Sequence, residues 1–125
     1  MNKIKDIINS SISVKEGLLT DVLINKISKI VNVCVDALNN GKTIYWCGNG
    51  GSAADAQHLA AELSGRFYYD RDPLPSEALH CNTSYITAVG NDYSYDVIYS
   101  RLIKGIGKSG DIIFGLSTSG KSNNI

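Results

Sequence analysis

Residues 42–65 read KTIYWCGNGGSAADAQHLAAELSG and decide the fold. The first six residues are mostly β-branched or aromatic, which predicts a strand over 42–47. Three glycines stand within the next four positions. Apolar residues then recur at helical spacing, which predicts a helix over 53–64. A strand, a glycine loop and a helix in succession are typical of an α/β fold that presents a loop to a ligand.

The start and the end of this helix carry recognisable signals. Ser52 and Asp55 have the spacing of a capping box, in which the serine hydroxyl accepts from the amide three residues later. Gly65 directly follows the predicted helix and is expected to end it. We therefore expect Ser52 to cap the helix.

The remaining pattern extends the same architecture over the whole chain. Helices are expected over 2–19, 23–38, 83–89 and 95–104, and further strands over 78–81 and 111–116. Strands separated by helices imply right-handed crossovers and a parallel sheet. The sequence therefore predicts a flavodoxin-like α/β fold with strand order 2-1-3, as one domain: a helical pair over 1–40, then the first part of an α/β core over 41–125.

Three strands are few for such a sheet, because both of its faces need covering. Residues 122–125 have the composition of a first helical turn. We expect the chain to be truncated after the third strand.

Composition excludes several classes of protein. Twelve basic residues balance twelve acidic ones, so a general nucleic-acid binder is not expected. No apolar run approaches the roughly 20 residues that cross a membrane, and the N-terminus has no signal-peptide core. Three cysteines without a CxxC pair fit reduced thiols, so we expect a cytoplasmic location.

The glycine loop at 48–51 is a candidate anion site, because small residues let backbone amides approach a ligand at a helix N-terminus. A tight turn that merely needs glycines is the structural alternative. Dinucleotide binding is a third interpretation, since Gly48, Gly50 and Ala53 fit a loose Rossmann fingerprint. That motif needs an acidic residue at the end of the next strand, and residues 80–82 are His-Cys-Asn.

A second small-residue loop follows the last strand, with four hydroxyls in the six residues 117–122. Hydroxyls and amides can surround phosphate oxygens without formal charge, although serine and threonine are also common in ordinary turns. In the order 2-1-3, strands 1 and 3 are neighbours. Both loops are then expected to flank one crevice.

His58 and Glu62 are four residues apart on the predicted helix and share a face with Asp55. Such a pair can ligate a metal, or act as a base with its orienting partner. The alternative is a solvated ion pair on the helix surface.

Three segments together resemble a known family: CGNGGSAADAQHLAAELSGRF at 47–67, VGNDYSYDVIYSR at 89–101 and LSTSGKS at 116–122. The chain resembles the sugar isomerase (SIS) domain family, and within it the phosphoheptose (D-sedoheptulose 7-phosphate) isomerases. The resemblance covers essentially all 125 residues, including the N-terminal helices.

The resemblance implies a role for each matching position. Glu62 would be the catalytic residue, and His58 and Glu62 would bind zinc, with the remaining ligands, a Gln and a His, beyond residue 125. The residues implied to bind substrate are Asn49, Gly50, Gly51, Ser52, Glu62, Asn91, Asp92, Ser117, Thr118, Ser119 and Ser122.

The implied reaction converts D-sedoheptulose 7-phosphate to D-glycero-D-manno-heptose 7-phosphate through an enediol, as a step toward the heptose of lipopolysaccharide or capsule. The resemblance also implies a homotetramer. Since half of the site is missing, we expect the 125-residue chain alone to be inactive or nearly so. The alternative is a non-catalytic SIS module that binds a phosphosugar or a protein partner, as in regulators and replication initiator-associating proteins. Relatives of that type tend to lack a carboxylate at the position of Glu62.

Overall fold

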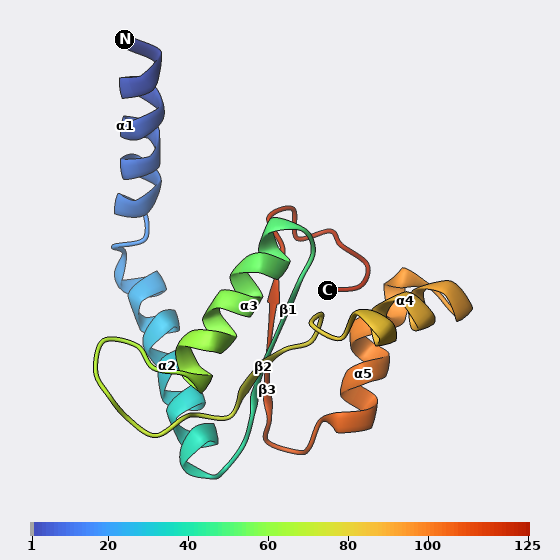
Figure 1. Ribbon diagram of the computed structural model, residues 1–125. Helices are drawn as coiled ribbons and strands as arrows, with labels where there is room; N and C mark the ends of the chain where they lie inside the picture. The colour runs from blue at the N-terminus through green and yellow to red at the C-terminus, as the bar shows by residue number, and fades with distance from the viewer. Residues whose placement is uncertain (1) are drawn as a thin grey trace. The chain divides into compact units, whose positions relative to one another are not determined.

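The computed structural model describes residues 2–125 and contains a parallel sheet with helices (Figure 1). The expected order of helices and strands is confirmed, with one short 3₁₀ turn, η1, added before the last helix. The elements are α1 (Asn2–Glu16), α2 (Asp21–Asn39), β1 (Ile44–Gly48), α3 (Gly51–Ser64), β2 (Ser76–Ala78), α4 (Thr83–Asp92), η1 (Tyr95–Val97), α5 (Ile98–Ile106) and β3 (Ile112–Leu116).

Contacts divide the chain into two compact units, Met1–Val35 and Asp36–Ile125, with the boundary inside α2. The first unit contains α1 and most of α2, and the isoleucines of both helices are largely exposed.

Helix α2 ends at the expected glycine stop. Gly41 has φ +65°, its amide bonds to Leu38 O, and the amide of Lys42 bonds to Ala37 O, which is a Schellman stop.

The three strands of the second unit are parallel in the order β2-β1-β3, which confirms the expected topology. β1 is central and all five of its residues are buried. In Figure 1, α3 lies on one side of the sheet and α4 and α5 lie on the other. Ala56 and Ala60 are the buried residues of α3, and their small side chains permit close packing on the sheet.

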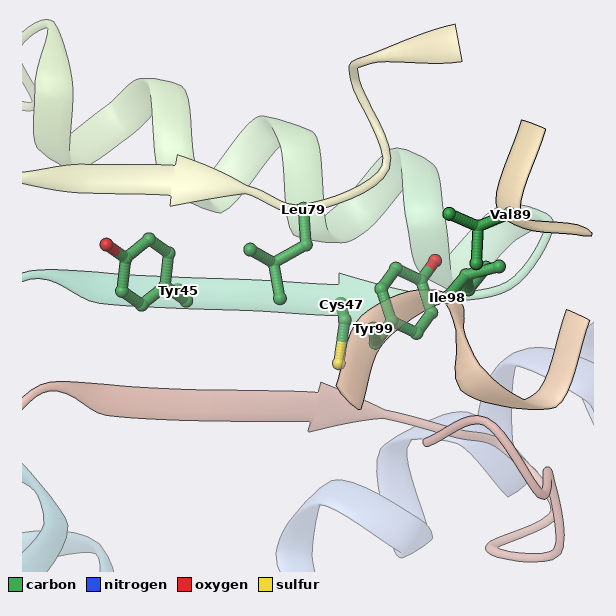
Figure 2. Close-up of a cluster of buried hydrophobic side chains, with 6 residues drawn as sticks. All are labelled: Tyr45, Cys47, Leu79, Val89, Ile98 and Tyr99. Atoms are coloured by element: carbon green, nitrogen blue, oxygen red, sulfur yellow. The ribbon is translucent and has the colours of Figure 1, made fainter. Parts of the chain in front are cut away.

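The core lies between β1 and the segments 79–99. Tyr45 and Cys47 point to the same face of β1 and pack with Leu79, Val89, Ile98 and Tyr99, as Figure 2 shows. By alternation, Trp46 belongs to the opposite face. There its ring stacks on Phe114 of β3 with the centroids 4.4 Å apart, and its indole N–H donates to Ser76 Oγ.

The expected capping box is wrong. α3 begins at Gly51, and its N-cap is Gly50, which has φ +56° and makes no side-chain cap bond. The helix starts earlier because the glycine at 50 can adopt this conformation, so that the amide of Ser52 bonds to Asn49 O. Ser52 therefore lies inside the first turn rather than before it.

Other expected bounds shift as well, and the first helix, expected over 2–19, ends at Glu16. The second strand is shorter and earlier than 78–81, because only Ser76–Ala78 pairs with β1 before the chain turns. α4 continues through Gly90 to Asp92, and α5 extends two residues beyond Lys104 after η1. Within residues 2–125, none of the helices is long and apolar enough to cross a membrane.

Candidate functional site

The two small-residue loops leave the sheet side by side. Gly48, the last residue of β1, pairs in register with Leu116, the last residue of β3. The glycine loop therefore continues from one strand and the Ser117–Ser122 loop continues from its neighbour, at the carboxyl edge of a parallel sheet. This is the edge at which ligands bind in open α/β sheets.

The glycine loop is held by hydrogen bonds to its carbonyl groups, whereas two of its amides have no partner in the described chain. The buried hydroxyl of Tyr99 donates to Gly48 O. Burial raises the pKa of Tyr99 to about 12, and the nearby Tyr95 adds to the shift. The amides of Ser52 and Ala53 bond back to loop carbonyls, whereas no hydrogen bond within residues 2–125 uses the amides of Gly50 and Gly51. The capacity of this loop to bind an anion therefore rests on those two amides.

The Ser117–Ser122 loop is organised by its own hydroxyls. The amide of Gly120 donates to Ser117 Oγ at 3.0 Å, and the amide of Lys121 donates to Ser119 Oγ at 3.2 Å. Ser117 Oγ and Ser122 Oγ lie 3.5 Å apart. A hydroxyl that accepts from an amide retains its own proton, so Ser117 and Ser119 can still donate to a phosphate oxygen.

Asn49 joins the two loops. Its side chain forms two hydrogen bonds with that of Asn124, at 2.8 and 2.9 Å, and accepts a third from the hydroxyl of Tyr95 at 3.0 Å. Sequence reasoning missed both Asn124 and Tyr95. The available signal was the polar run at 122–124, where the hydroxyl loop ends.

His58 and Glu62 lie on α3 with Nε2 and Oε1 3.0 Å apart. His58 is 70% exposed and Glu62 is 32% exposed. At about 1.5 Å of rise per residue, they stand about 10 and 16 Å along the helix from Gly51. The pair is therefore separate from the loops, and only an elongated ligand contacts both.

The side chains present match only part of the expected zinc site. Two ligand atoms on a tetrahedral zinc are about 3.3 Å apart, so the spacing of His58 and Glu62 suits two of its positions. Across residues 2–125, no three His, Cys, Asp or Glu side chains gather as a metal group. These residues fit half of a zinc site, and further ligands would come from outside them.

Other candidate residues lie apart from this centre. Asn91 donates to Asp92 Oδ1 at 2.9 Å at the end of α4, and no hydrogen bond in the described chain links either residue to the two loops. Asp55 is exposed on α3. The three cysteines are free, and burial raises the pKa of the Cys47 thiol.

Two surface hollows of about 370 and 360 Å³ lie along α5. The first contains Arg101, whose guanidinium lies 4.1 Å from the centre of the Tyr93 ring. The second is lined by residues of α5 and the core together with Ile113, Asn124 and Ile125. Neither of these two hollows is lined by the glycines of the loop.

Several known proteins are similar to this chain along nearly all of its length. The phosphoheptose isomerases of Sulfurimonas denitrificans and Clostridium acetobutylicum are each 50% identical to it, over 98% and 99% of this chain. A solved phosphoheptose isomerase from Francisella tularensis superposes with a TM-score of 0.91 at 36% identity over 98% of this chain, and one from Neisseria gonorrhoeae with 0.88 at 37%.

These similar proteins are longer. The chain spans 63% and 64% of the two curated relatives and the same shares of the two solved chains. The family model described as the SIS domain matches residues 10–125. The sequence resemblance to phosphoheptose isomerases, the parallel sheet and the paired loops at its carboxyl edge agree with that match, and the chain belongs to the SIS domain family.

Proposed function

We propose that this SIS domain acts as a ketose–aldose isomerase that converts D-sedoheptulose 7-phosphate to D-glycero-D-manno-heptose 7-phosphate. The observation that carries the proposal is 50% identity to proteins named phosphoheptose isomerase along essentially the whole chain. Nothing in the site favours the non-catalytic alternative, because Glu62 is present and paired with His58.

The phosphate group would bind at the edge where the two loops meet. The free amides of Gly50 and Gly51 and the hydroxyls of Ser117, Thr118, Ser119 and Ser122 can donate to its oxygens. Lys121 is the only lysine or arginine within the loop, and it is exposed. Hydrogen bonds from neutral groups to a charged acceptor are stronger than neutral pairs, so this loop needs no buried cation.

Glu62 is the proposed base. Isomerisation removes a proton from C1 of the ketose and returns one to C2 of the enediol, with the oxygens exchanging a proton as the carbonyl moves. His58 Nε2 lies 3.0 Å from Glu62 Oε1 and can orient the carboxylate. The separation along α3 between this pair and the glycine loop suits a substrate whose reacting carbons stand far from its phosphate. A seven-carbon sugar 7-phosphate is such a molecule.

Zinc is proposed as the cofactor, held in part by His58 and Glu62. When bound, it would polarise the substrate oxygen next to the carbon that loses its proton. Gly50, Gly51, Ser52, Asn91 and Asp92 are proposed as further substrate contacts. Asn91 and Asp92 would reach the sugar from the end of α4.

Assembly as a homotetramer is proposed from the helices of the first unit. Ile4, Ile7 and Ile8 of α1 are 53–65% exposed, and Ile27 and Ile30 of α2 are 48–49% exposed. Apolar helix faces of this kind are usually covered by another chain.

We also propose that the enzyme is cytoplasmic and that its product supplies heptose for surface polysaccharide.

Turnover of D-sedoheptulose 7-phosphate tests the proposal. The substrate is given to the 125-residue chain and to the same chain extended with the C-terminal part of the Sulfurimonas denitrificans enzyme. Because residues 2–125 hold two side chains of a site that needs three, we expect activity in the extended protein and little or none in the short one.

Glu62→Gln in the extended protein should lower kcat about a hundredfold or more and change KM little, because the carboxylate acts in the transition state. Glu77→Gln on β2 is the matched control, since Glu77 is an exposed glutamate on another element. Full activity of the Glu62 variant would remove the proposed base. Strong turnover by the short chain would contradict the half-site argument.

A further inference from the structure

Asn124 is a buried polar residue with a single partner for its side-chain amide. It is 9% exposed and is the one polar residue in the buried set of the described chain. A buried amide is costly unless its donors and acceptors are paired. Both side-chain hydrogen bonds of Asn124 in the described chain are made with Asn49, one as acceptor at 2.8 Å and one as donor at 2.9 Å.

The chain folds back over β3 to bring Asn124 to this place. After the hydroxyl loop, the amide of Ile125 bonds to Ser122 O in a tight turn. Ile125 then packs over β3 so closely that a Cβ at Gly115 would lie 2.8 Å from its Cγ2. The absence of a side chain at position 115 therefore allows the turn that carries Asn124 across to the end of β1.

The hydrogen bonds of the Asn49 side chain determine which of its donor and acceptor positions stay free for a ligand. Its Oδ1 has two lone pairs, and both are used, one by Asn124 Nδ2 and the other by the hydroxyl of Tyr95. Its Nδ2 has two protons, and one is used by Asn124 Oδ1. The side chain of Asn49 therefore has one N–H to offer and no free acceptor.

We infer that Asn124 is a positioning residue that locks Asn49, with help from Tyr95, so that Asn49 can only donate to a ligand. The locked side chain recognises an acceptor oxygen, such as a sugar hydroxyl or carbonyl oxygen. This inference rests on the proposed function for the nature of the ligand, whereas the pairing itself stands on the geometry of the free chain.

The first arm of the test uses the ligand-free 125-residue chain. Amide hydrogen exchange and the side-chain NH₂ signals are followed by NMR in the wild type, in Asn124→Ala and in Asn123→Ala. Asn123 is the matched control because it is an exposed asparagine next to Asn124. In Asn124→Ala we expect the Ser52 amide, which bonds to Asn49 O, to exchange about tenfold faster, equivalent to the loss of one hydrogen bond.

Two more variants guard against simple misfolding. Asn124→Asp keeps the size of the side chain and the acceptor for Asn49 Nδ2 but loses the donor, and Tyr95→Phe removes only the hydroxyl. Tyr95→Phe should show a smaller effect of the same kind, and Asn124→Asp one at least as large because its carboxylate faces Asn49 Oδ1, with β1 and α3 otherwise unchanged. Unaltered exchange at Ser52 in Asn124→Ala, or an equal change in Asn123→Ala, would overturn the inference.

The second arm separates positioning from a general structural role. The dissociation constants of D-sedoheptulose 7-phosphate and of inorganic phosphate are measured for each folded variant. We expect Asn124→Ala to weaken sugar-phosphate binding about tenfold and phosphate binding less than twofold, since only the sugar contacts Asn49. Equal weakening of both ligands would contradict the positioning role. If the extended wild-type protein binds neither ligand, the proposed function fails, and the exchange arm alone decides the inference.

Discussion

β1 and β3 are neighbouring strands of equal length, and they differ in how they are held. All five residues of β1 are buried, whereas β3 alternates between half-buried and exposed positions. The difference continues into the loops. The glycine loop is fixed by side chains from distant parts of the sequence, namely Tyr99, Tyr95 and Asn124. The hydroxyl loop is organised mainly by bonds between residues two to five positions apart.

The contrast separates stability from binding. A change at the buried start of the glycine loop, where Gly48 contacts Ser52 and Tyr99, should affect folding. A change at an exposed hydroxyl of the other loop removes a ligand contact and leaves the core intact.

At the opposite end of the two strands, hydrogen bonds to Asp111 connect their starts. Asp111 accepts the amide of Thr43 at 2.9 Å and that of Lys108 at 2.7 Å. These bonds lower the pKa of Asp111, with the Thr43 amide as the largest cause.

The largest effect is expected for Gly48→Ala. A Cβ at this position would lie 2.5–2.6 Å from the backbone oxygen and carbon of Ser52, so α3 must move away from β1. We expect the free energy of unfolding to fall by about 2–3 kcal/mol, as for other overpacked sites. Urea unfolding followed by circular dichroism measures it.

Gly51→Ala is the control for this change. A Cβ at position 51 meets no atom within 4 Å, so its effect should stay within about 0.5 kcal/mol. If Gly48→Ala proves as mild as the control, the close contact between β1 and α3 is not what fixes the glycine loop.

An intermediate effect is expected for Tyr99→Phe, which removes the bond to Gly48 O and leaves a buried carbonyl unpaired. We expect a loss of about 1–2 kcal/mol at pH 7. Because the pKa of Tyr99 in the folded chain is raised to about 12, above its unfolded value of about 10, this contribution is complete below pH 10 and disappears as the pH rises to 12. The phenylalanine variant should lack that alkaline loss.

Stability measured from pH 8 to 12 checks this prediction, with Tyr68→Phe as the control at a tyrosine that is 91% exposed. The wild type and the Tyr68 variant should lose stability together between pH 10 and 12. Parallel pH profiles for the wild type and the Tyr99 variant would show that Tyr99 does not anchor the glycine loop.

Much of this fold was predictable because its signals are local. The apolar run of β1, the glycines after it and the αL stop at Gly41 determine elements from neighbouring residues. The order 2-1-3, which the structure confirms, came from the flavodoxin-like alternation of strands and helices. The start of α3 was predicted wrongly, because a capping box competes with a glycine at 50 that can itself adopt the cap conformation. The length of β2 depends on its register with β1, which no local pattern contains.

In the candidate site too, contacts between residues close in sequence were predictable and those between distant residues were not. The spacing of His58 and Glu62 predicts their pairing, since i and i+4 positions meet on any helix. The partnership of Asn49 with Asn124 joins residues 75 positions apart, and only the fold over Gly115 brings them together. The roles of Asn91 and Asp92 stay a prediction.

The smallest effect on stability is expected for Ser119→Ala. Ser119 is exposed, and its hydroxyl accepts only the amide of Lys121 at 3.2 Å, so the free energy of unfolding should change by less than about 0.5 kcal/mol. Its binding effect should be large by comparison, because the hydroxyl proton is free to donate to a phosphate oxygen. We expect the affinity for D-sedoheptulose 7-phosphate to fall by about 1–3 kcal/mol, measured by calorimetry. Ser109→Ala, at an exposed serine before β3, is the control and should leave affinity unchanged. If Ser119→Ala lowers stability instead of affinity, the hydroxyl loop is a structural turn like any other, and the contrast between the two strands has no functional meaning.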